Sequence, residues 1–389
     1  MTALLRPATE VALSSAFFFG VLLGLAGSLK LTLARSLNPG EGKVAVLLRV
    51  ENLALTLVFF LAGFLIDSIG IQPVVVLGSV AAAFSVFGLS YPRNAFGSFL
   101  SVLTGCLGAA GLGVASMVLM PLALFPHKPT ASLNLGILFF ATGALITPPL
   151  LDVLMRLIGI KRALVLISFA CLIPGLSAAV VSSSELRVEA AESADIGASL
   201  SRSTLWLACL VYLLYAPLEA SISSWASAYL KDKKSGDGRA TKLLSAFWCT
   251  FVASRLIVAG LMVTDYFHAD WDAWSLVVPA LLAAVVLGNM AGMVGTNWAY
   301  VGLPLLGLCL GPIAPTLFGM ILTPPEQGSA QCEGTAIGMI LAAGSLGTLI
   351  ATPLVAWSVR SDSPQSALRV QMLLALLLTA VALLFGLRV

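Results

Sequence analysis

The sequence predicts an all-α membrane protein whose twelve transmembrane helices form two pseudo-symmetric six-helix bundles. Three observations indicate this fold class: the composition, the number of apolar stretches, and a likeness between the two halves of the chain. Of 389 residues, 59% are hydrophobic and 10% are charged, and the mean hydropathy is +1.01. Soluble domains carry charges at roughly a quarter of their positions. The composition therefore excludes an ordinary soluble protein.

Twelve stretches are apolar over about 20 residues, the length of helix that crosses a bilayer. We expect spans at 11–34, 44–66, 73–91, 96–122, 131–151, 163–182, 205–230, 243–263, 275–294, 299–322, 334–357 and 369–387. The longest connection, 183–203, mixes acidic and basic residues with several Ser and Ala, which is typical of a solvated linker. This predicts an N-terminal bundle at 1–182, a cytoplasmic linker at 183–203 and a C-terminal bundle at 204–389.

The two halves share short segments at a nearly constant offset. Residues 62–67 read AGFLID and residues 259–265 read AGLMVTD, at the ends of the second and eighth spans. Residues 141–145 read ATGAL and residues 342–346 read AAGSL, in the fifth and eleventh spans. Two echoes in matching spans favour a duplicated six-helix unit. Parallel six-helix repeats are an architecture of membrane transporters, with the substrate bound near the midplane.

Residue usage excludes several other classes. The net charge of +3 is spread through the loops, so we expect no nucleic-acid partner. The six cysteines form no CxxC pair, and neither a disulfide nor a metal is implied. The two histidines, His127 and His268, lie in predicted loops, and no HExxH, GxSxG or Walker pattern occurs. We therefore expect no catalytic residues, no enzyme activity and no cofactor other than a coupling ion, H⁺ or Na⁺.

Glu219 is the leading candidate for a functional residue. It is a carboxylate in the middle of an otherwise apolar, aromatic or hydroxylated span, and such residues usually mark ion or substrate routes. Tyr212, Tyr215 and Ser223 lie on the same helical stripe, and Tyr215 and Ser223 are one turn before and after Glu219. Glu219 is thus the expected ion-coupling residue, and Tyr215 and Ser223 are candidate substrate ligands. The alternative is a glutamate that only fixes helix packing.

Arg255 is the second charge inside a span, and it shares a helical stripe with Trp248. It could pair with a carboxylate, for which Glu51 is the best candidate, orient a substrate, or reach the membrane surface along its stem. Trp248 and Arg255 are candidate substrate-binding residues, as are three asparagines in or beside spans. These are Asn52, Asn134 and Asn297, which could equally hold helices together.

One motif resembles a known family. Residues 63–70 read GFLIDSIG, which is similar to the GxLxDxxG signature of the major facilitator superfamily. Gly63 permits close helix contact, Asp67 can cap a helix or meet a basic partner, and Gly70 permits a tight turn. The three residues form the expected conformational motif. The family usually places basic residues after the Asp and the second Gly, but this chain has Ser68, Ile71 and Gln72.

Four further segments resemble the fucose/proton symporter branch of the superfamily and its sodium-coupled glucose-transporter relatives. They are 133–148, 215–229, 247–255 and 311–315. The resemblance implies alternating access, a cavity lined by the first, fourth, seventh and tenth spans, and symport of a small hydroxylated, sugar-like solute. The alternatives are efflux of amphipathic compounds by the same fold and a non-transporting scaffold or receptor.

The resemblance also implies a multi-pass protein of the cell (inner) membrane, a monomer, with both termini in the cytoplasm. Under that topology five Lys and Arg residues lie inside and thirteen outside. This distribution is opposite to the positive-inside rule. Direction of transport and membrane orientation therefore stay open at the level of the sequence.

Overall fold

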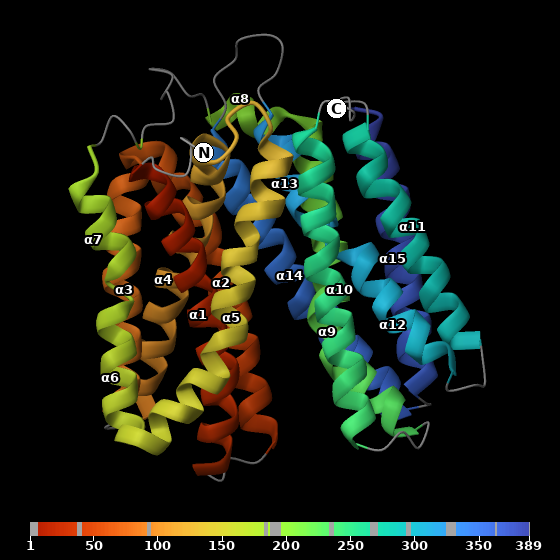
Figure 1. Cartoon of the computed structure of the whole chain (residues 1–389), viewed down its shortest axis with the longest axis horizontal. Helices are drawn as coiled ribbons and strands as arrows, with labels where there is room; N and C mark the ends of the chain where they lie inside the picture. The colour runs from red at the N-terminus through yellow and green to blue at the C-terminus, as the bar shows by residue number, and fades with distance from the viewer. Residues whose placement is uncertain are drawn as a thin grey trace. The chain divides into compact units, whose positions relative to one another are not determined.

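A computed structural model describes residues 7–36, 41–91, 95–182, 186, 196–232, 237–264, 271–292, 297–323, 332–361 and 364–388. These residues form fifteen helices (Figure 1). In chain order, the helices of the first half are α1 Pro7–Ser36, α2 Glu41–Ile69, α3 Ile71–Ser90, α4 Ala95–Ala123, α5 Pro129–Ile158, α6 Ile160–Ala170, α7 Ile173–Val180 and α8 Ile196–Ser201. Those of the second half are α9 Ser203–Asp232, α10 Asp237–Val263, α11 Trp271–Gly292, α12 Asn297–Leu310, α13 Ile313–Leu322, α14 Glu333–Ser361 and α15 Pro364–Gly386.

All twelve predicted spans are confirmed as helical segments long and apolar enough to cross a membrane. Two of them are interrupted. The sixth span is divided into α6 and α7, which follow one another along α3 (Figure 1). The tenth is divided into α12 and α13 at Gly311 and Pro312. Proline has no N–H to donate to the preceding turn, which explains why the helix is broken there.

The described residues form two compact units. Unit 1 comprises residues 1–132, 136–200 and 324–342, and unit 2 comprises 133–135, 201–323 and 343–389. The pairs of helices in contact correspond in the two units. In unit 1, α4 packs on α1, α2 and α3; in unit 2, the tenth span, α12 with α13, packs on α9, α10 and α11. Likewise α3 contacts α6, and α11 contacts α15. This correspondence agrees with two pseudo-symmetric bundles.

The second sequence echo has a matching packing role in each unit. A Cβ atom on Gly143 of α5 would lie 2.1 Å from the carbonyl oxygen of Phe17 in α1. A Cβ atom on Gly344 of α14 would lie 2.3 Å from the ring of Tyr212 in α9. Only glycine allows these close approaches. The fifth span therefore packs on the first as the eleventh packs on the seventh.

The first echo has no such equivalence. A Cβ on Gly63 of α2 would lie 2.2 Å from the carbonyl oxygen of Gly334, whereas one on Gly260 of α10 would meet nothing within 4 Å. Gly63 is buried and Gly260 is exposed. The duplicated glycine thus has a packing role in unit 1 only. Asp265, which closes the second copy of the segment, lies outside the described residues.

Candidate functional site

The middle of α9 carries an aromatic and acidic stripe. Tyr212 and Tyr215 stack with their ring centroids 5.8 Å apart, and the Tyr212 ring lies 5.1 Å from that of Phe318 in α13. Tyr215 is fully buried and Glu219, one turn further on, is half-buried. Both tyrosines interact electrostatically with the Glu219 carboxylate. The three described members of the predicted stripe, Tyr212, Tyr215 and Glu219, therefore interact with one another.

Arg255 of α10 interacts electrostatically with the same tyrosines and is only 3% exposed. Its Nε donates a hydrogen bond to the carbonyl oxygen of Gly311 at 2.8 Å. Its guanidinium carbon lies 4.3 Å from the centroid of the Phe251 ring, one turn earlier in α10. The cation is thus stabilised by a main-chain dipole and an aromatic face, two interactions that suit arginine.

The interruption of the tenth span provides the acceptor for Arg255. In a continuous helix the carbonyl of Gly311 would accept a bond from the N–H of residue 315, but residue 315 is proline. The carbonyl is available to a side chain for that reason. The neighbouring carbonyl, of Leu310, accepts a hydrogen bond from the Tyr215 hydroxyl at 3.0 Å. The helix break therefore binds one side chain from α9 and one from α10.

Position 311 itself admits only glycine. A Cβ atom there would lie 2.1 Å from the Ser254 hydroxyl and 2.4 Å from the Phe251 carbonyl oxygen of α10. Gly344 of α14 makes room for the Tyr212 ring in the same way. Gly311 thus allows close contact with α10, and Gly344 allows close contact with the Tyr212 ring of α9.

Together these residues form a polar cluster inside unit 2: Glu219, Tyr212, Tyr215, Arg255 and the carbonyls of Leu310 and Gly311. The Glu219 carboxylate and the Arg255 guanidinium both interact electrostatically with the hydroxyls of Tyr212 and Tyr215. Such an arrangement can donate and accept hydrogen bonds with a hydroxylated ligand.

Trp248 lies next to this cluster. Its ring is 5.3 Å from that of Phe251, which carries the guanidinium of Arg255 on its face. The predicted stripe from Trp248 to Arg255 therefore continues through Phe251. Trp248 is half-buried.

Two of the three candidate asparagines have a described partner within their own unit. Asn134 is fully buried, and its Nδ2 donates to the Thr316 hydroxyl of α13 at 3.4 Å. This supports the helix-adhesion alternative for Asn134. Asn52 of unit 1 is half-buried, and its main-chain oxygen accepts a bond from the Thr56 hydroxyl at 2.9 Å. The side chains of Ser223 and Asn297 lie outside the described part of the chain.

Asp67 binds a helix end within unit 1. Its two carboxylate oxygens accept hydrogen bonds from the backbone N–H groups of Gly334 at 3.0 Å and Thr335 at 2.7 Å, at the start of α14. A carboxylate at a helix N-terminus satisfies free donors and complements the helix dipole. From the sequence, Asp67 could cap the helix that follows it or meet a basic partner. The following helix, α3, has Gly70 as its N-cap residue, with φ of 93° and no side-chain cap hydrogen bond.

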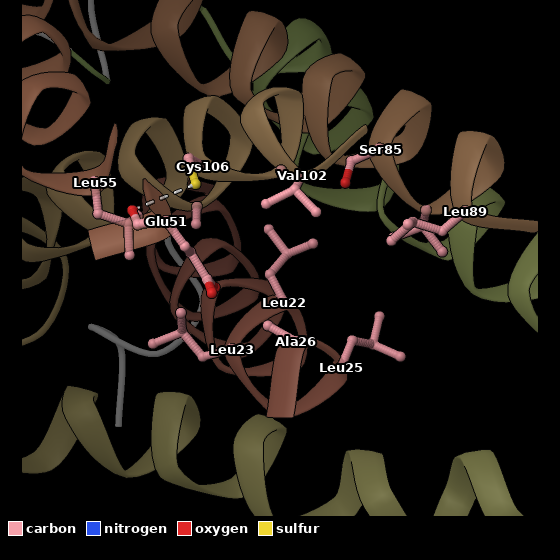
Figure 2. Close-up of a pocket in the computed structure, with 13 residues that line it drawn as sticks. Leu22, Leu23, Leu25, Ala26, Glu51, Leu55, Ser85, Leu89, Val102 and Cys106 are labelled. Atoms are coloured by element: carbon pink, nitrogen blue, oxygen red, sulfur yellow. Dashed lines mark hydrogen bonds between the residues drawn. The ribbon is translucent and has the colours of Figure 1, made fainter. Parts of the chain in front are cut away.

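The structure gives the guanidinium of Arg255 the Gly311 carbonyl as a hydrogen-bond partner. This acceptor is available because the proline at 315 leaves it without a helical partner. Glu51, the carboxylate that the sequence offered for Arg255, belongs to unit 1, where it is 8% exposed and lines a cavity (Figure 2). The pairing of Arg255 with Glu51 stays a prediction.

Gln72 occupies a place where the superfamily motif usually has a basic residue. Its Nε2 donates to the carbonyl oxygens of Ala178 at 2.8 Å and Val181 at 3.2 Å, at the end of α7. These oxygens lack helical partners because the helix ends there. A neutral amide therefore ties α3 to α7 in unit 1.

Comparison with solved structures identifies the class of this fold. The chain has the fold of the major facilitator superfamily, the twelve-helix fold of many membrane transporters. It is thus a multi-pass membrane protein. No family model and no curated protein sequence matches the chain.

Three solved transporters illustrate the likeness. FucP in its outward conformation has a TM-score of 0.78 at 18% identity, with 98% of this chain and 99% of that chain covered. A bacterial homologue of the iron transporter ferroportin has the same TM-score and identity, with 99% and 100% covered. The proton:xylose symporter XylE has a TM-score of 0.73 at 13% identity, with 96% and 94% covered. All three are transporters rather than enzymes, in keeping with the expectation from the sequence.

Proposed function

We propose that this protein is a secondary active transporter of the cell (inner) membrane that moves a small hydroxylated, sugar-like solute by symport with H⁺ or Na⁺. The observation that carries the proposal is the position of Glu219 beside Tyr212, Tyr215 and Arg255 inside a membrane-spanning unit. An ionisable group at such a depth is costly and usually serves an ion or substrate route. We assign ion coupling to Glu219.

The surrounding groups suit a hydroxylated solute. Phenol hydroxyls both donate and accept hydrogen bonds, and a guanidinium donates several. Aromatic faces at Tyr212 and Trp248 can pack against the apolar face of a sugar ring. Two of the solved structures with this fold are FucP and the proton:xylose symporter XylE. The ferroportin homologue shows that the same fold also serves an iron transporter, so substrate must be tested directly.

The test is uptake into proteoliposomes that contain the purified protein. A panel of radiolabelled sugars and polyols, with iron(II) as comparator, is offered under an imposed pH gradient, an imposed Na⁺ gradient, or neither. We expect one sugar or polyol to accumulate with one of the two gradients. Accumulation that needs neither gradient, or that occurs for iron(II) alone, would overturn the proposal.

Glu219→Gln then tests the coupling role. The variant keeps the size of the side chain but cannot carry a charge, so it should lose accumulation against a gradient while still exchanging labelled for unlabelled solute. Glu10→Gln, the same change at an exposed site in the first turn of α1, is the matched control. Accumulation at the wild-type level in Glu219→Gln would remove this residue from the mechanism.

A further inference from the structure

The guanidinium of Arg255 uses one edge for the protein and leaves another edge for a ligand. Its Nε donates to the Gly311 carbonyl oxygen at 2.8 Å, and its central carbon lies over the Phe251 ring, 4.3 Å from the centroid. The two Nη groups donate to no acceptor in the described part of the chain. The whole residue is only 3% exposed. In-plane N–H donors are therefore held inside unit 2 without an acceptor among the described residues.

The phenols next to Arg255 offer hydroxyl contacts. Tyr212 is half-buried, and its hydroxyl has no hydrogen-bond partner among the described residues. The Tyr215 hydroxyl donates to the Leu310 carbonyl at 3.0 Å, so its oxygen remains able to accept. Arg255 interacts electrostatically with both tyrosines. The same region thus provides guanidinium donors and hydroxyl groups for one ligand.

The charge of the cluster limits what it can bind. With Glu219 ionised, the charges of Glu219 and Arg255 cancel. A proton on Glu219, or Na⁺ beside it, adds one positive charge when the site is loaded. A neutral sugar leaves that charge uncompensated inside a membrane-spanning unit, where an unpaired charge is costly. A solute with one negative charge restores neutrality.

Other charged groups near α9 do not alter this balance. In unit 2, α10, α13 and α15 contact α9, and α14 also approaches it closely. Glu219 is the charged residue of α9 whose side chain is described. On the other four helices, the charged or acidic side chains described in this unit, apart from Arg255, are Lys242, Cys249 and Arg369, and all three are exposed. Exposed groups are screened by their surroundings.

We propose that the solute of this site is a sugar acid, a polyhydroxylated monocarboxylate, carried together with one H⁺ or Na⁺. The proposal rests on the transport function proposed above and narrows its substrate class. The solute carboxylate pairs with the Nη edge of Arg255 through two parallel charge-assisted bonds, a geometry that suits arginine. The solute hydroxyls bond to Tyr212 and Tyr215. The empty and the loaded site are then both neutral.

Other solute classes fit the cluster less well. A neutral sugar satisfies the hydroxyls but leaves the Nη donors without a charged acceptor and the added cation uncompensated. A solute with two negative charges leaves an excess negative charge in the loaded site. An amine meets repulsion from Arg255. The monocarboxylate is the class that satisfies both the donors and the charge.

The first test measures binding in detergent, where no gradient is involved. Three acids are compared with neutral solutes of the same carbon skeleton: D-glucuronate with D-glucose, D-galacturonate with D-galactose, and D-gluconate with sorbitol. Isothermal titration calorimetry of the purified protein at fixed pH and Na⁺ concentration gives the affinities. We expect at least one acid to bind about tenfold or more tightly than its neutral counterpart, as a charge-assisted pair implies. The proposal is overturned if no acid does so.

Two variants locate the carboxylate. Arg255→Lys keeps the charge but not the planar fork, so it should weaken the acid about tenfold and leave the neutral counterpart unaffected. Arg255→Gln should abolish the preference for the acid. Arg369→Gln removes an exposed positive charge in the same unit and should behave as wild type. A folded Arg255→Gln protein that still prefers the acid would contradict the assignment.

The second test is electrical and uses the wild-type protein, so it decides even if the Arg255 variants do not fold. Each labelled acid is offered to proteoliposomes under a pH or Na⁺ gradient, with the membrane potential held at zero by valinomycin and equal K⁺. In a parallel experiment an inside-negative K⁺ diffusion potential is the driving force. We expect accumulation with a gradient and none with the potential alone, because one cation and one anion move together. Accumulation driven by the potential alone would show that the loaded site is not neutral.

The outcomes separate this proposal from the transport function on which it rests. Gradient-driven accumulation of a neutral sugar but of no acid would keep the transport function and overturn the sugar-acid assignment. Tight, Arg255-dependent binding of an acid that accumulates with neither gradient would keep the ligand class and overturn coupled symport. Protein-free liposomes give the background in both experiments.

Discussion

The Nε of Arg255 in α10 lies 2.8 Å from the carbonyl oxygen of Gly311, at the break between α12 and α13. This bond joins a buried cation to a main-chain acceptor that exists because Pro315 cannot donate an N–H. It fixes the guanidinium beside Tyr212 and Tyr215. The bond therefore joins the helix break in the tenth span to the side chain that interacts with the tyrosines of the seventh span.

The first prediction tests this link with a double-mutant cycle. Arg255→Leu should lower the free energy of unfolding by about 1.5–3 kcal/mol, the usual contribution of a hydrogen bond with a charged group. Pro315→Ala restores an N–H that can bind the Gly311 carbonyl. The effect of Arg255→Leu should then be smaller in the Pro315→Ala background than in wild type, as measured by melting temperature.

A surface variant controls for the loss of a positive charge. Arg156 in α5 forms an ion pair with Asp152 at 2.8 Å, but both side chains are more than half exposed. Such pairs contribute little to stability, so Arg156→Leu should leave the melting temperature nearly unchanged. Strictly additive effects of the Arg255 and Pro315 substitutions would show that the two positions do not share the acceptor.

The second prediction separates the two tyrosines. Tyr215→Phe removes the hydroxyl that donates to the Leu310 carbonyl, at a cost of about 0.5–1.5 kcal/mol in stability. It should also reduce gradient-driven accumulation more than solute exchange, because the hydroxyl lies beside Glu219. Tyr212→Phe preserves the ring contacts with Tyr215 and Phe318 and should be the milder change in melting temperature. A larger loss of melting temperature in Tyr212→Phe than in Tyr215→Phe would contradict the assignment of the stabilising hydrogen bond to the Tyr215 hydroxyl.

The third prediction concerns Asp67. Asp67→Ala leaves two N–H groups of α14 without their carboxylate, and loss of a helix cap typically lowers stability by about 0.5–2 kcal/mol. Because Asp67 acts on a helix end rather than on the solute, the turnover rate should change while the apparent affinity for solute does not.

Ser68→Ala is the neighbouring control for Asp67. Ser68 is exposed, and its hydroxyl bonds back to the Phe64 carbonyl at 2.7 Å, so its loss should leave rate and affinity unaltered. A large loss of affinity in Asp67→Ala at constant rate would place Asp67 in the solute site instead.

The fourth prediction uses two glycines in helices. Gly344→Ala puts a methyl group 2.3 Å from the Tyr212 ring, so it should lower the melting temperature and impair transport together. Gly260→Ala meets nothing within 4 Å and should raise the helix stability by about 0.5–1 kcal/mol, since alanine is the better helix former. Equal responses of the two variants would mean that the Gly344 contact is not formed in the working protein.

The sequence predicted the spans well because hydrophobic length is a strong and local signal. All twelve apolar stretches are helical, and the echo at Gly143 and Gly344 corresponds to equivalent packing in the two units. The echo at Gly63 and Gly260 does not, because the two positions have different neighbours. Similar letters at a fixed offset therefore reveal duplication but not whether both copies kept the same contacts.

The candidate site was predicted in part. The stripe through Tyr215 and Glu219 follows from helical periodicity alone. The partner of Arg255 could not be found in this way, because the acceptor is a main-chain oxygen and carries no residue-type signal. The available clue was the proline four residues after Gly311.

The hydrogen-bond acceptor at the break in the tenth span has a consequence for how this protein can change through mutation. An acceptor formed by the main chain is retained through changes in the surrounding side chains as long as residue 315 is proline, and position 311 tolerates only glycine because α10 touches it. Substrate preference can therefore diverge through Tyr212, Tyr215 and Trp248 while the anchor of the cation persists. Among descendants of this chain, loss of Pro315 should accompany loss of Arg255. Arg255 needs the Gly311 carbonyl as an acceptor, and that carbonyl is available because residue 315 is proline.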